Sequence, residues 1–315
     1  MLKRRLFRLI GLLFFVYVLS RLDWSRLWSI LKEGQLVWLG AAFFANLPQL
    51  WLKATRWRML LEHQGLHVTR RKAFLYYMSA VFMGVVTPGR LGELAKAVYL
   101  RQDGVTSLAH GFSSVVMDRL CDLYLLCLLG TFGITVLNPW KSSSLIGWGG
   151  FLMVLLVGGA GYYVLKGEGR FYGKYVAPRL PEPVREHLQE FNRGLVLLLG
   201  KVLPAAFFLT ICSYAIYFFQ CYLVAKAFSL PVTYWMLVPI MALTNLFSFL
   251  PISISGLGTR EAALLFLLRP RGIPVEVIIA FSLGILAVFF IGGGLLGFAA
   301  WWMEPVGFKT VASER

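Results

Sequence analysis

The sequence is poor in acidic residues, cysteine and histidine, and these shortages exclude several kinds of site. Its 315 residues include 15 Asp and Glu, four Cys and four His. All four cysteines fall in apolar segments, and none has the CxxC spacing of metal ligands. His63 and His67 are separated by Gly65 and have no third ligand candidate near them. We therefore expect no metal site.

A nucleotide-binding motif is also missing, since no GxxxxGK[ST] run occurs. We therefore expect no cofactor and no direct use of ATP. The 31 Lys and Arg give a formal net charge of +16, which in a soluble protein would suggest nucleic acid. No nucleic-acid motif accompanies the charge, and basic residues also gather in the cytoplasmic loops of membrane proteins, near anionic headgroups. We expect membrane lipids as partners and no nucleic acid.

Hydrophobic residues make up 58% of the chain, against roughly 45–50% in soluble domains. Apolar runs comparable to the ~20 helical residues that span a bilayer recur along the chain. They fall near residues 6–20, 36–52, 73–100, 107–137, 145–165, 202–225, 235–268 and 275–303. The first follows basic residues as in a signal peptide, but no cleavage pattern comes after it, so we interpret it as a retained helix. The sequence predicts an all-α polytopic membrane protein with a single transmembrane domain over residues 1–315.

Two of these apolar runs are interrupted midway by Pro and Gly. The interruptions contain Pro88, Gly89 and Gly92 in the first, and Pro251, Gly256 and Gly258 in the second. Pro removes a backbone donor and Gly permits left-handed geometry, so each break can turn the chain back on itself. Unwound backbone at membrane depth must line protein or a water-filled cavity. We predict two re-entrant hairpins made of broken helices; the alternative is that Pro and Gly only kink helices that cross once.

The distribution of basic residues favours the hairpins. With the amino terminus in the cytoplasm and both hairpins re-entrant, cytoplasmic stretches hold 20 Lys and Arg and outer stretches hold 7. If each broken segment crossed once, the basic connector 166–201 would lie outside, against the positive-inside rule. The prediction is a multi-pass protein of the cell membrane with six spanning helices and both termini cytoplasmic. Its halves, about residues 36–137 and 202–303, form an inverted repeat, a pattern that points to a transporter's central site.

Eight charged residues fall inside apolar segments. They are Arg90, Glu93, Lys96, Asp118, Arg119, Asp122, Arg260 and Glu261. Each would cost roughly 2.5–3.5 kcal/mol at the centre of a lipid-facing helix, so they must face one another or water. Asp118 and Asp122 share one helix face and need a cation, for which Arg90, Lys96 and Arg260 are candidates.

The amino termini of the half-helices, at Gly89–Gly92 and Gly256–Thr259, would direct free amides towards an anion such as a phosphate headgroup. The alternative is that the charges form buried ion pairs that only lock the fold, and that Lys96 extends to the membrane surface.

Three sequence motifs resemble the flippase-like transmembrane region of lysylphosphatidylglycerol synthases and its stand-alone relatives. They are Thr87-Pro88-Gly89-Arg90-Leu91-Gly92-Glu93, then Val116-Met117-Asp118-Arg119 with Asp122, and Ile254-Ser255-Gly256-Leu257-Gly258-Thr259-Arg260-Glu261-Ala262. The resemblance covers about residues 5–303. It implies a membrane domain that moves a modified phospholipid, or another polar-headed or polyprenyl-linked lipid, between leaflets.

In those synthases a soluble aminoacyl-transferring domain follows the membrane region, whereas this chain ends soon after its last apolar segment. The resemblance therefore implies no synthase activity. The sequence predicts a lipid flippase in which Arg90 and Arg260 engage the headgroup phosphate, and Glu93, Glu261, Asp118 and Asp122 hold those arginines or a cationic headgroup. Arg119 is predicted to be a further residue of the substrate-binding site. The rivals are an intramembrane transferase with Asp118 or Glu93 as general base, and a non-catalytic partner of a separate lipid-modifying enzyme.

The topology is tested by labelling cysteines introduced at Lys174 and Lys141 in a background without the native cysteines. We expect an impermeant thiol reagent to label the two positions from opposite sides of the membrane, with Lys174 cytoplasmic. Labelling of both positions from the same side would rule out the inverted-hairpin topology.

Overall fold

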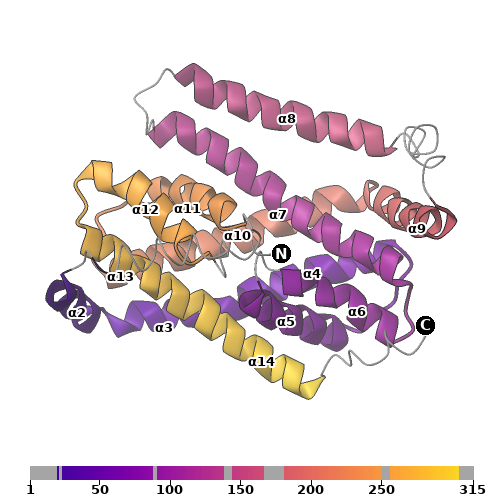
Figure 1. The fold of residues 1–315 in the computed structure, drawn as a ribbon, viewed down its shortest axis with the longest axis horizontal. Helices are drawn as coiled ribbons and strands as arrows, with labels where there is room; N and C mark the ends of the chain where they lie inside the picture. The colour runs from indigo at the N-terminus through magenta and orange to yellow at the C-terminus, as the bar shows by residue number, and fades with distance from the viewer. Residues whose placement is uncertain are drawn as a thin grey trace.

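The structure, a computed structural model, describes residues 20, 23–87, 91–137, 144–166, 181–249 and 256–304. The first part of the chain forms α2 (Trp24–Glu33), α3 (Leu36–Phe44), α4 (Asn46–His63), α5 (Arg70–Val86), the 3-10 turn η1 (Leu91–Leu94), α6 (Ala95–Gln102), α7 (Leu108–Leu137) and α8 (Ser144–Lys166). The second part forms α9 (Glu182–Leu198), α10 (Val202–Ala227), α11 (Tyr234–Phe249), α12 (Thr259–Leu268), η4 (Arg269–Arg271), α13 (Val275–Ile285), the π-helical η5 (Leu286–Gly292) and α14 (Gly293–Met303). Over the described residues the chain is helical throughout and has no strand, which confirms the all-α prediction (Figure 1).

Three helices differ from the predicted segments. Helix α4 continues to His63, well beyond the predicted end at residue 52. Helices α2 and α9 lie where connecting stretches were predicted. The N-cap of helix α2 is Asp23, whose carboxylate accepts hydrogen bonds from the Ser25 hydroxyl and from the Ser25 and Arg26 amides. These bonds cap the helix and hold the pKa of the Asp23 carboxyl below its usual range.

Some predicted features lie outside the described residues. They are Pro88, Gly89, Arg90, Pro251, nearly all of the first apolar run and both termini. The description resumes on the far side of each interruption, at Leu91 and at Gly256. The course of the chain on either side of the two breaks is therefore defined.

Helices α5 and α6 form an antiparallel hairpin around the first interruption. A Cβ atom added to Gly92 would lie 2.2 Å from the backbone carbonyl of Met83, so the two arms touch next to the break. Further along, the rings of Tyr76 and Tyr99 stack at 4.4 Å between centroids. At the open end the Lys72 ammonium lies 2.6 Å from the Asp103 carboxylate. In each of these pairs the two residues lie equally far along the chain from the break, as expected for two antiparallel helices.

Helices α11 and α12 pack against each other around the second interruption. Gly256 and Gly258 have φ of +78° and +87°, in the left-handed region that favours glycine. A Cβ atom on Gly256 would lie 2.9 Å from the Ser248 hydroxyl near the end of α11. In Figure 1 the α11–α12 hairpin lies towards the end of the molecule that carries α2, and the α5–α6 hairpin lies towards the end that carries α9.

Each helix that follows a hairpin packs against a helix of the other hairpin. Helix α7 packs on α11, and α14 packs on α5, while α4 and α10 pack on each other. The α7–α11 and α14–α5 contacts are both close, because in each a glycine of one helix faces the other helix. A Cβ atom on Gly133 of α7 would lie 2.4 Å from Pro239, and one on Gly297 of α14 would lie 2.5 Å from the Met78 carbonyl oxygen. Small residues of this kind permit close helix contacts in membranes.

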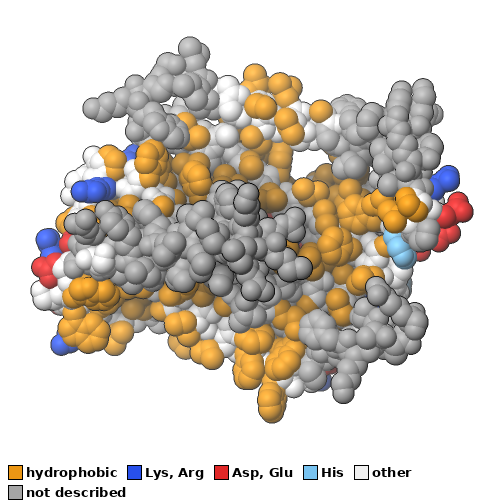
Figure 2. Space-filling model, viewed as in Figure 1, with side chains coloured by type: hydrophobic (Ala, Val, Ile, Leu, Met, Phe, Trp, Pro, Cys, Tyr) orange, Lys and Arg blue, Asp and Glu red, His pale blue; other side chains and the backbone are white. Residues whose placement is uncertain are grey.

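The surface separates apolar from charged side chains. Figure 2 shows hydrophobic side chains over the middle of one face, whereas the visible Lys, Arg, Asp and Glu lie towards its two ends. Within the described residues, α10 and the continuous α13–η5–α14 (Val275–Met303) are long and apolar enough to cross a membrane. Trp148–Ala160 and Tyr234–Ser248 are shorter apolar helices.

The close contact at Gly92 provides a test of the first hairpin. Gly92→Ala should force its two arms apart, since the new methyl group meets backbone atoms that cannot rotate away. Overpacking of this kind costs about 1–3 kcal/mol, which for a protein of this size corresponds to a fall in Tm of roughly 3–10 °C. The measurement is the Tm of the purified protein in detergent.

Gly149→Ala is the matched control, because Gly149 also lies in a helix and a Cβ atom added to it would have no neighbouring atom within 4 Å. It should leave the Tm unchanged or raise it slightly. Equal effects of the two substitutions would contradict the hairpin register.

Candidate functional site

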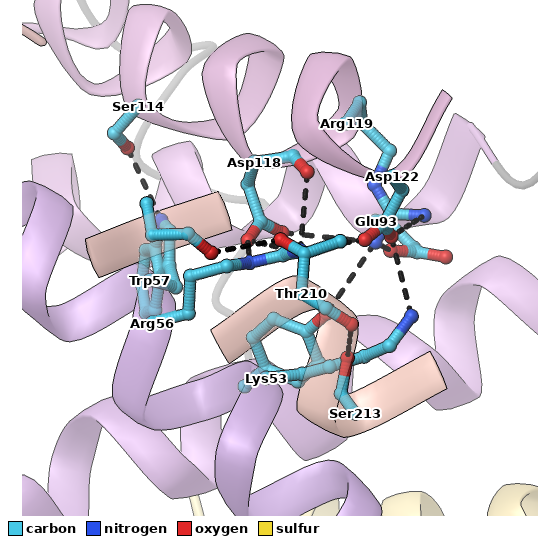
Figure 3. A network of polar contacts seen from close by, with 12 residues as sticks. Lys53, Arg56, Trp57, Glu93, Ser114, Asp118, Arg119, Asp122, Thr210 and Ser213 are labelled. Atoms are coloured by element: carbon cyan, nitrogen blue, oxygen red, sulfur yellow. Dashed lines mark hydrogen bonds and ion pairs between the residues drawn. The ribbon is translucent and has the colours of Figure 1, made fainter. Parts of the chain in front are cut away.

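A buried network of polar contacts is organised by Arg56 of α4 (Figure 3). Its Nη2 atom lies 2.7 Å from Asp118 Oδ1, and its Nη1 atom lies 2.6 Å from Asp122 Oδ1, both on α7. Nη1 also donates to the Thr210 hydroxyl of α10 at 2.6 Å. All three charged side chains are fully buried. Arg56 therefore ties α4 and α7 to α10 through charge-assisted hydrogen bonds.

Two lysines also form ion pairs with the aspartates. Lys96 of α6 lies 2.7 Å from Asp118 Oδ2, and its ammonium also lies 4.3 Å from the Tyr77 ring centroid. Lys53 of α4 lies 3.2 Å from Asp122 Oδ2. Lys96 is fully buried, so it does not extend to the membrane surface. Of the predicted partners for the aspartates, Lys96 is present and Arg260 is not.

Glu93 and Arg119 form a neighbouring ion pair between η1 and α7. Glu93 packs over Gly84 of α5, where a Cβ atom would lie 2.8 Å from the Glu93 side chain. The Arg119 side chain is 20% exposed, unlike the sealed Arg56. Its guanidinium also lies 3.7 Å from the Asp118 carboxylate and 3.8 Å from that of Asp122. This pair connects the sealed cluster to the more open region beside it.

The second half contributes a separate ion pair. Arg260 of α12 donates from Nη2 to Glu261 Oε1 at 2.8 Å and from Nε to the Ser282 hydroxyl of α13 at 2.8 Å. Its guanidinium carbon lies 5.4 Å from the centre of the Phe290 ring. The remaining nitrogen, Nη1, is buried and has no hydrogen-bond partner within the described residues. Arg260 is thus fixed in place with one donor unused.

The helix amides that were expected to be free are already bonded. The Gly92 amide donates to the Thr87 hydroxyl at 2.7 Å, and the Gly258 amide donates to Glu261 Oε2 at 2.6 Å. Glu261 therefore caps its own helix in addition to pairing with Arg260. The expectation of free amides is therefore wrong at these two positions.

A cavity of about 110 Å³ lies between the two parts of the chain. The first part lines it with Lys53, Glu93, Arg119, Asn46, Gln49 and Tyr77, and the second with Arg260, Asn245, Ser248, Tyr214, Tyr217, Phe289 and Phe290. The site residues Glu93, Arg119 and Arg260 thus meet at one cavity, although they come from three different elements. Asp118 and Asp122 stand behind it, within the sealed cluster.

The wall formed by Phe289 and Phe290 belongs to η5, a π-helical segment between α13 and α14. A π-helical segment displaces carbonyls from the regular helical pattern and is frequent at functional sites. Here the Asn46 side-chain amide donates to the Val288 carbonyl at 3.0 Å. The polar contact joins α4 to the π segment and closes one side of the cavity.

Sequence reasoning missed Lys53 and Arg56, which it counted among cytoplasmic basic residues because they follow an apolar run. A signal was available. Asn46, Gln49, Lys53 and Arg56 repeat at helical spacing, which places one polar stripe on a single face of α4. Without Lys53 and Arg56 the predicted cytoplasmic stretches still hold 18 of the 20 basic residues counted, well above the 7 in the outer stretches.

Comparison with known proteins identifies a family and a distant relative. Residues 6–297 match the family model described as the lysylphosphatidylglycerol synthase TM region. The chain is also 21% identical over 318 residues to the UPF0104 membrane protein MJ1595 of Methanocaldococcus jannaschii, an alignment that covers 95% of this chain and 94% of that protein. The family model describes the membrane region alone.

The stability of variants tests whether the fully buried Arg56 cluster and the partly exposed Glu93–Arg119 pair differ in their contribution to folding. Arg56→Ala should leave Asp118 and Asp122 under-compensated and cost about 3–5 kcal/mol. Glu93→Gln should fold, since it keeps a hydrogen-bonding side chain against the partly exposed Arg119. The measurement is the yield and Tm of monodisperse protein in detergent.

Arg58→Ala is the control for Arg56→Ala, because Arg58 lies on the same helix but is partly exposed, where it pairs with Glu62 and donates to the Val68 carbonyl. It should cost much less than Arg56→Ala, since a partly exposed ion pair contributes little. If Glu93→Gln lowered the Tm as much as Arg56→Ala, the Glu93–Arg119 pair would have to be regarded as structural, like the pairs of Arg56.

Proposed function

Because this chain belongs to the membrane family of the lysylphosphatidylglycerol synthase TM region, we propose that it is a lipid flippase or lipid-transport protein. It moves a polar-headed phospholipid or a polyprenyl-linked lipid between leaflets. The family predicted from the sequence motifs is confirmed over nearly the whole chain. The membrane location follows from the same match, and the protein is linked to lipid handling through its family.

The observation that carries the proposal is the cavity that Arg119 and Arg260 share. These arginines and Lys53 line it together with one carboxylate, that of Glu93. The Nη1 atom of Arg260 is a buried donor with no partner in the described part of the chain. A phosphate headgroup supplies the acceptor and the negative charge that such a site lacks.

The helix arrangement supports an inverted repeat with halves at about residues 36–137 and 202–303. In this proposal the two hairpins enter the membrane from opposite sides, and six helices span it. Equivalent helices make equivalent contacts, since α7 lies on α11 as α14 lies on α5. In this proposal α4 and α10 are equivalent helices, and their mutual contact would lie on the axis that relates the halves. The cavity at this axis is where transporters of inverted design bind their substrate.

Glu93, Arg119 and Arg260 are the proposed headgroup residues, with Arg90 as a further candidate outside the described residues. Asp118 and Asp122 hold Arg56, Lys96 and Lys53, and Glu261 holds Arg260. Their proposed role is to position the cations and not to contact the lipid. Transport would be passive or coupled to an ion gradient.

The test is leaflet exchange of an acyl-labelled phosphatidylglycerol in liposomes, measured by dithionite quenching. Wild type should exchange the lipid, and Arg260→Lys should slow it by about tenfold or more, since loss of one hydrogen bond to a charged group costs about 1.5–3 kcal/mol. Arg90→Lys should also be slowed.

Arg269→Lys is the matched control, because Arg269 is an exposed arginine at the end of the same helix. It should exchange lipid like wild type. Exchange by wild type together with equal rates in all three variants would show that these arginines are not headgroup residues. Chemically altered lipid would favour the transferase, and neither exchange nor chemistry would favour a scaffold.

A further inference from the structure

Lys53 lies at the boundary between the sealed ion-pair cluster and the cavity. Its ammonium is 3.2 Å from Asp122 Oδ2 in the cluster, whereas its side chain is 12% exposed and lines the cavity (Figure 3). The Asp122 side chain is fully buried. One lysine therefore contacts both a buried negative charge and the space that a ligand would occupy.

Asp122 does not depend on Lys53 alone for compensation of its charge. Arg56 Nη1 lies 2.6 Å from the other carboxylate oxygen, and the Arg119 guanidinium lies 3.8 Å from the carboxylate. Of these three cations Lys53 is the one that can become neutral, because an arginine stays protonated in proteins whereas a buried lysine can lose its proton. A neutral Lys53 leaves Asp122 with two arginines.

Charged and titratable groups from several elements face Lys53 or line the cavity with it. They are Arg56 of α4, Asp122 and Arg119 of α7, Glu93 of η1, Arg260 of α12, and the phenols of Tyr77, Tyr214 and Tyr217. The carboxylates favour the ammonium form of Lys53, whereas the arginines and burial favour the neutral amine. A phosphate anion in the cavity acts in the same sense as the carboxylates. Its arrival therefore shifts Lys53 towards the ammonium form.

The other ionisable groups near the cavity are less suited to exchange a proton. Arg119 and Arg260 remain charged. Glu93 is bound to Arg119, and a proton on the carboxylate would break that ion pair. Lys96 is fully buried and is not a lining residue. Among the described residues of the wall, Lys53 is thus the one cation whose charge can change.

The cavity is polar and large enough for water to deliver and remove the proton. Its volume of about 110 Å³ exceeds the roughly 10–15 Å³ that one water molecule needs. Asn46, Gln49 and Ser248 line it and offer hydrogen-bond partners. A proton can therefore pass between the Lys53 amine and water without a further protein group.

We infer that this protein is a proton symporter in which Lys53 takes a proton from cavity water when an anionic phosphate headgroup binds, and returns it to water when the headgroup leaves on the other side. The inference rests on the proposed function and names its coupling ion. The N–H bond formed and broken at Lys53 Nζ is the one bond that changes. The charges of the proton and the headgroup cancel, so a cycle moves no net charge. Protonation and headgroup binding strengthen each other by the same factor.

The experiment measures the final leaflet ratio of a trace of acyl-labelled phosphatidylglycerol in phosphatidylcholine liposomes under two imposed gradients. A pH difference of about one unit should enrich the lipid roughly tenfold in the leaflet on the alkaline side, because proton and headgroup reach equilibrium together. A potassium diffusion potential without a pH difference should leave the ratio unchanged. Protein-free liposomes give the background for both gradients.

Two substitutions of Lys53 reverse these responses. Lys53→Met removes the exchangeable proton and Lys53→Arg fixes the positive charge, so neither variant should respond to the pH difference. Both should respond to the potential, because the headgroup then moves alone as an anion. The final ratio does not depend on the transport rate, so a slower variant still gives a clear result. Lys226→Met is the matched control, since Lys226 is an exposed lysine near the end of α10, and it should keep the response to pH.

Proton uptake on binding is measured separately from transport. Short-chain phosphatidylglycerol is added to the protein in weakly buffered detergent containing an indicator dye, over a series of starting pH values. Wild type and Lys226→Met should take up protons in part of this series, whereas Lys53→Met and Lys53→Arg should take up none.

The outcomes distinguish this inference from the proposed function. Exchange by wild type without a response to pH, or a response that both Lys53 variants keep, overturns proton coupling through Lys53 and keeps transport. Lys53-dependent proton uptake without exchange keeps the coupling of proton and headgroup binding and overturns transport. Neither exchange nor proton uptake overturns both.

Discussion

The pairing of Arg56 with Asp118 and Asp122 is the interaction on which the interior of this protein depends. An unpaired charge in an apolar interior is expensive, and removing one partner of a buried pair leaves the other without compensation. Arg56 lies on α4, both aspartates lie on α7, and the Thr210 hydroxyl that accepts from Arg56 lies on α10. The relative positions of three helices are thus fixed by one guanidinium. Lys96 holds α6 against the Asp118 carboxylate. The adjoining η1 brings Glu93 to the cavity.

The parts of the fold that the sequence predicts are those with strong local signals. Pro and Gly at residues 88–92 and 251–258 mark the hairpins because few other residues permit a chain to reverse there. Long apolar runs give the helices. By contrast, α2 and α9 mix polar and apolar residues along short segments, so they resemble connecting stretches until a packing partner is known. The end of α4 could not be found from apolarity, because Lys53, Arg56 and Arg58 interrupt the apolar run before the helix ends.

For the site, sequence spacing finds partners within one helix but not between helices. Asp118 and Asp122 are recognisable as a pair because they lie four residues apart on one face. Glu93, by contrast, pairs among the described residues with Arg119, which lies on a different element, α7. That contact depends on how α5, η1 and α7 pack, and the decisive feature is the missing side chain of Gly84. A short-range rule contains no information about such a contact.

The difference between Arg56 and Arg260 explains how one fold can combine a rigid interior with a releasable ligand. Arg56 uses its nitrogens on aspartates and a hydroxyl, so a ligand would have to break those bonds to reach it. Arg260 is held by Glu261 and Ser282 through two nitrogens, and its third nitrogen has no hydrogen-bond partner among the described residues. If the proposed function holds, a phosphate could bind there without disturbing the ion pair and would gain a limited number of bonds. The proposed transport would need this balance, because a headgroup bound by every donor of both arginines would be held too tightly to leave on the opposite side.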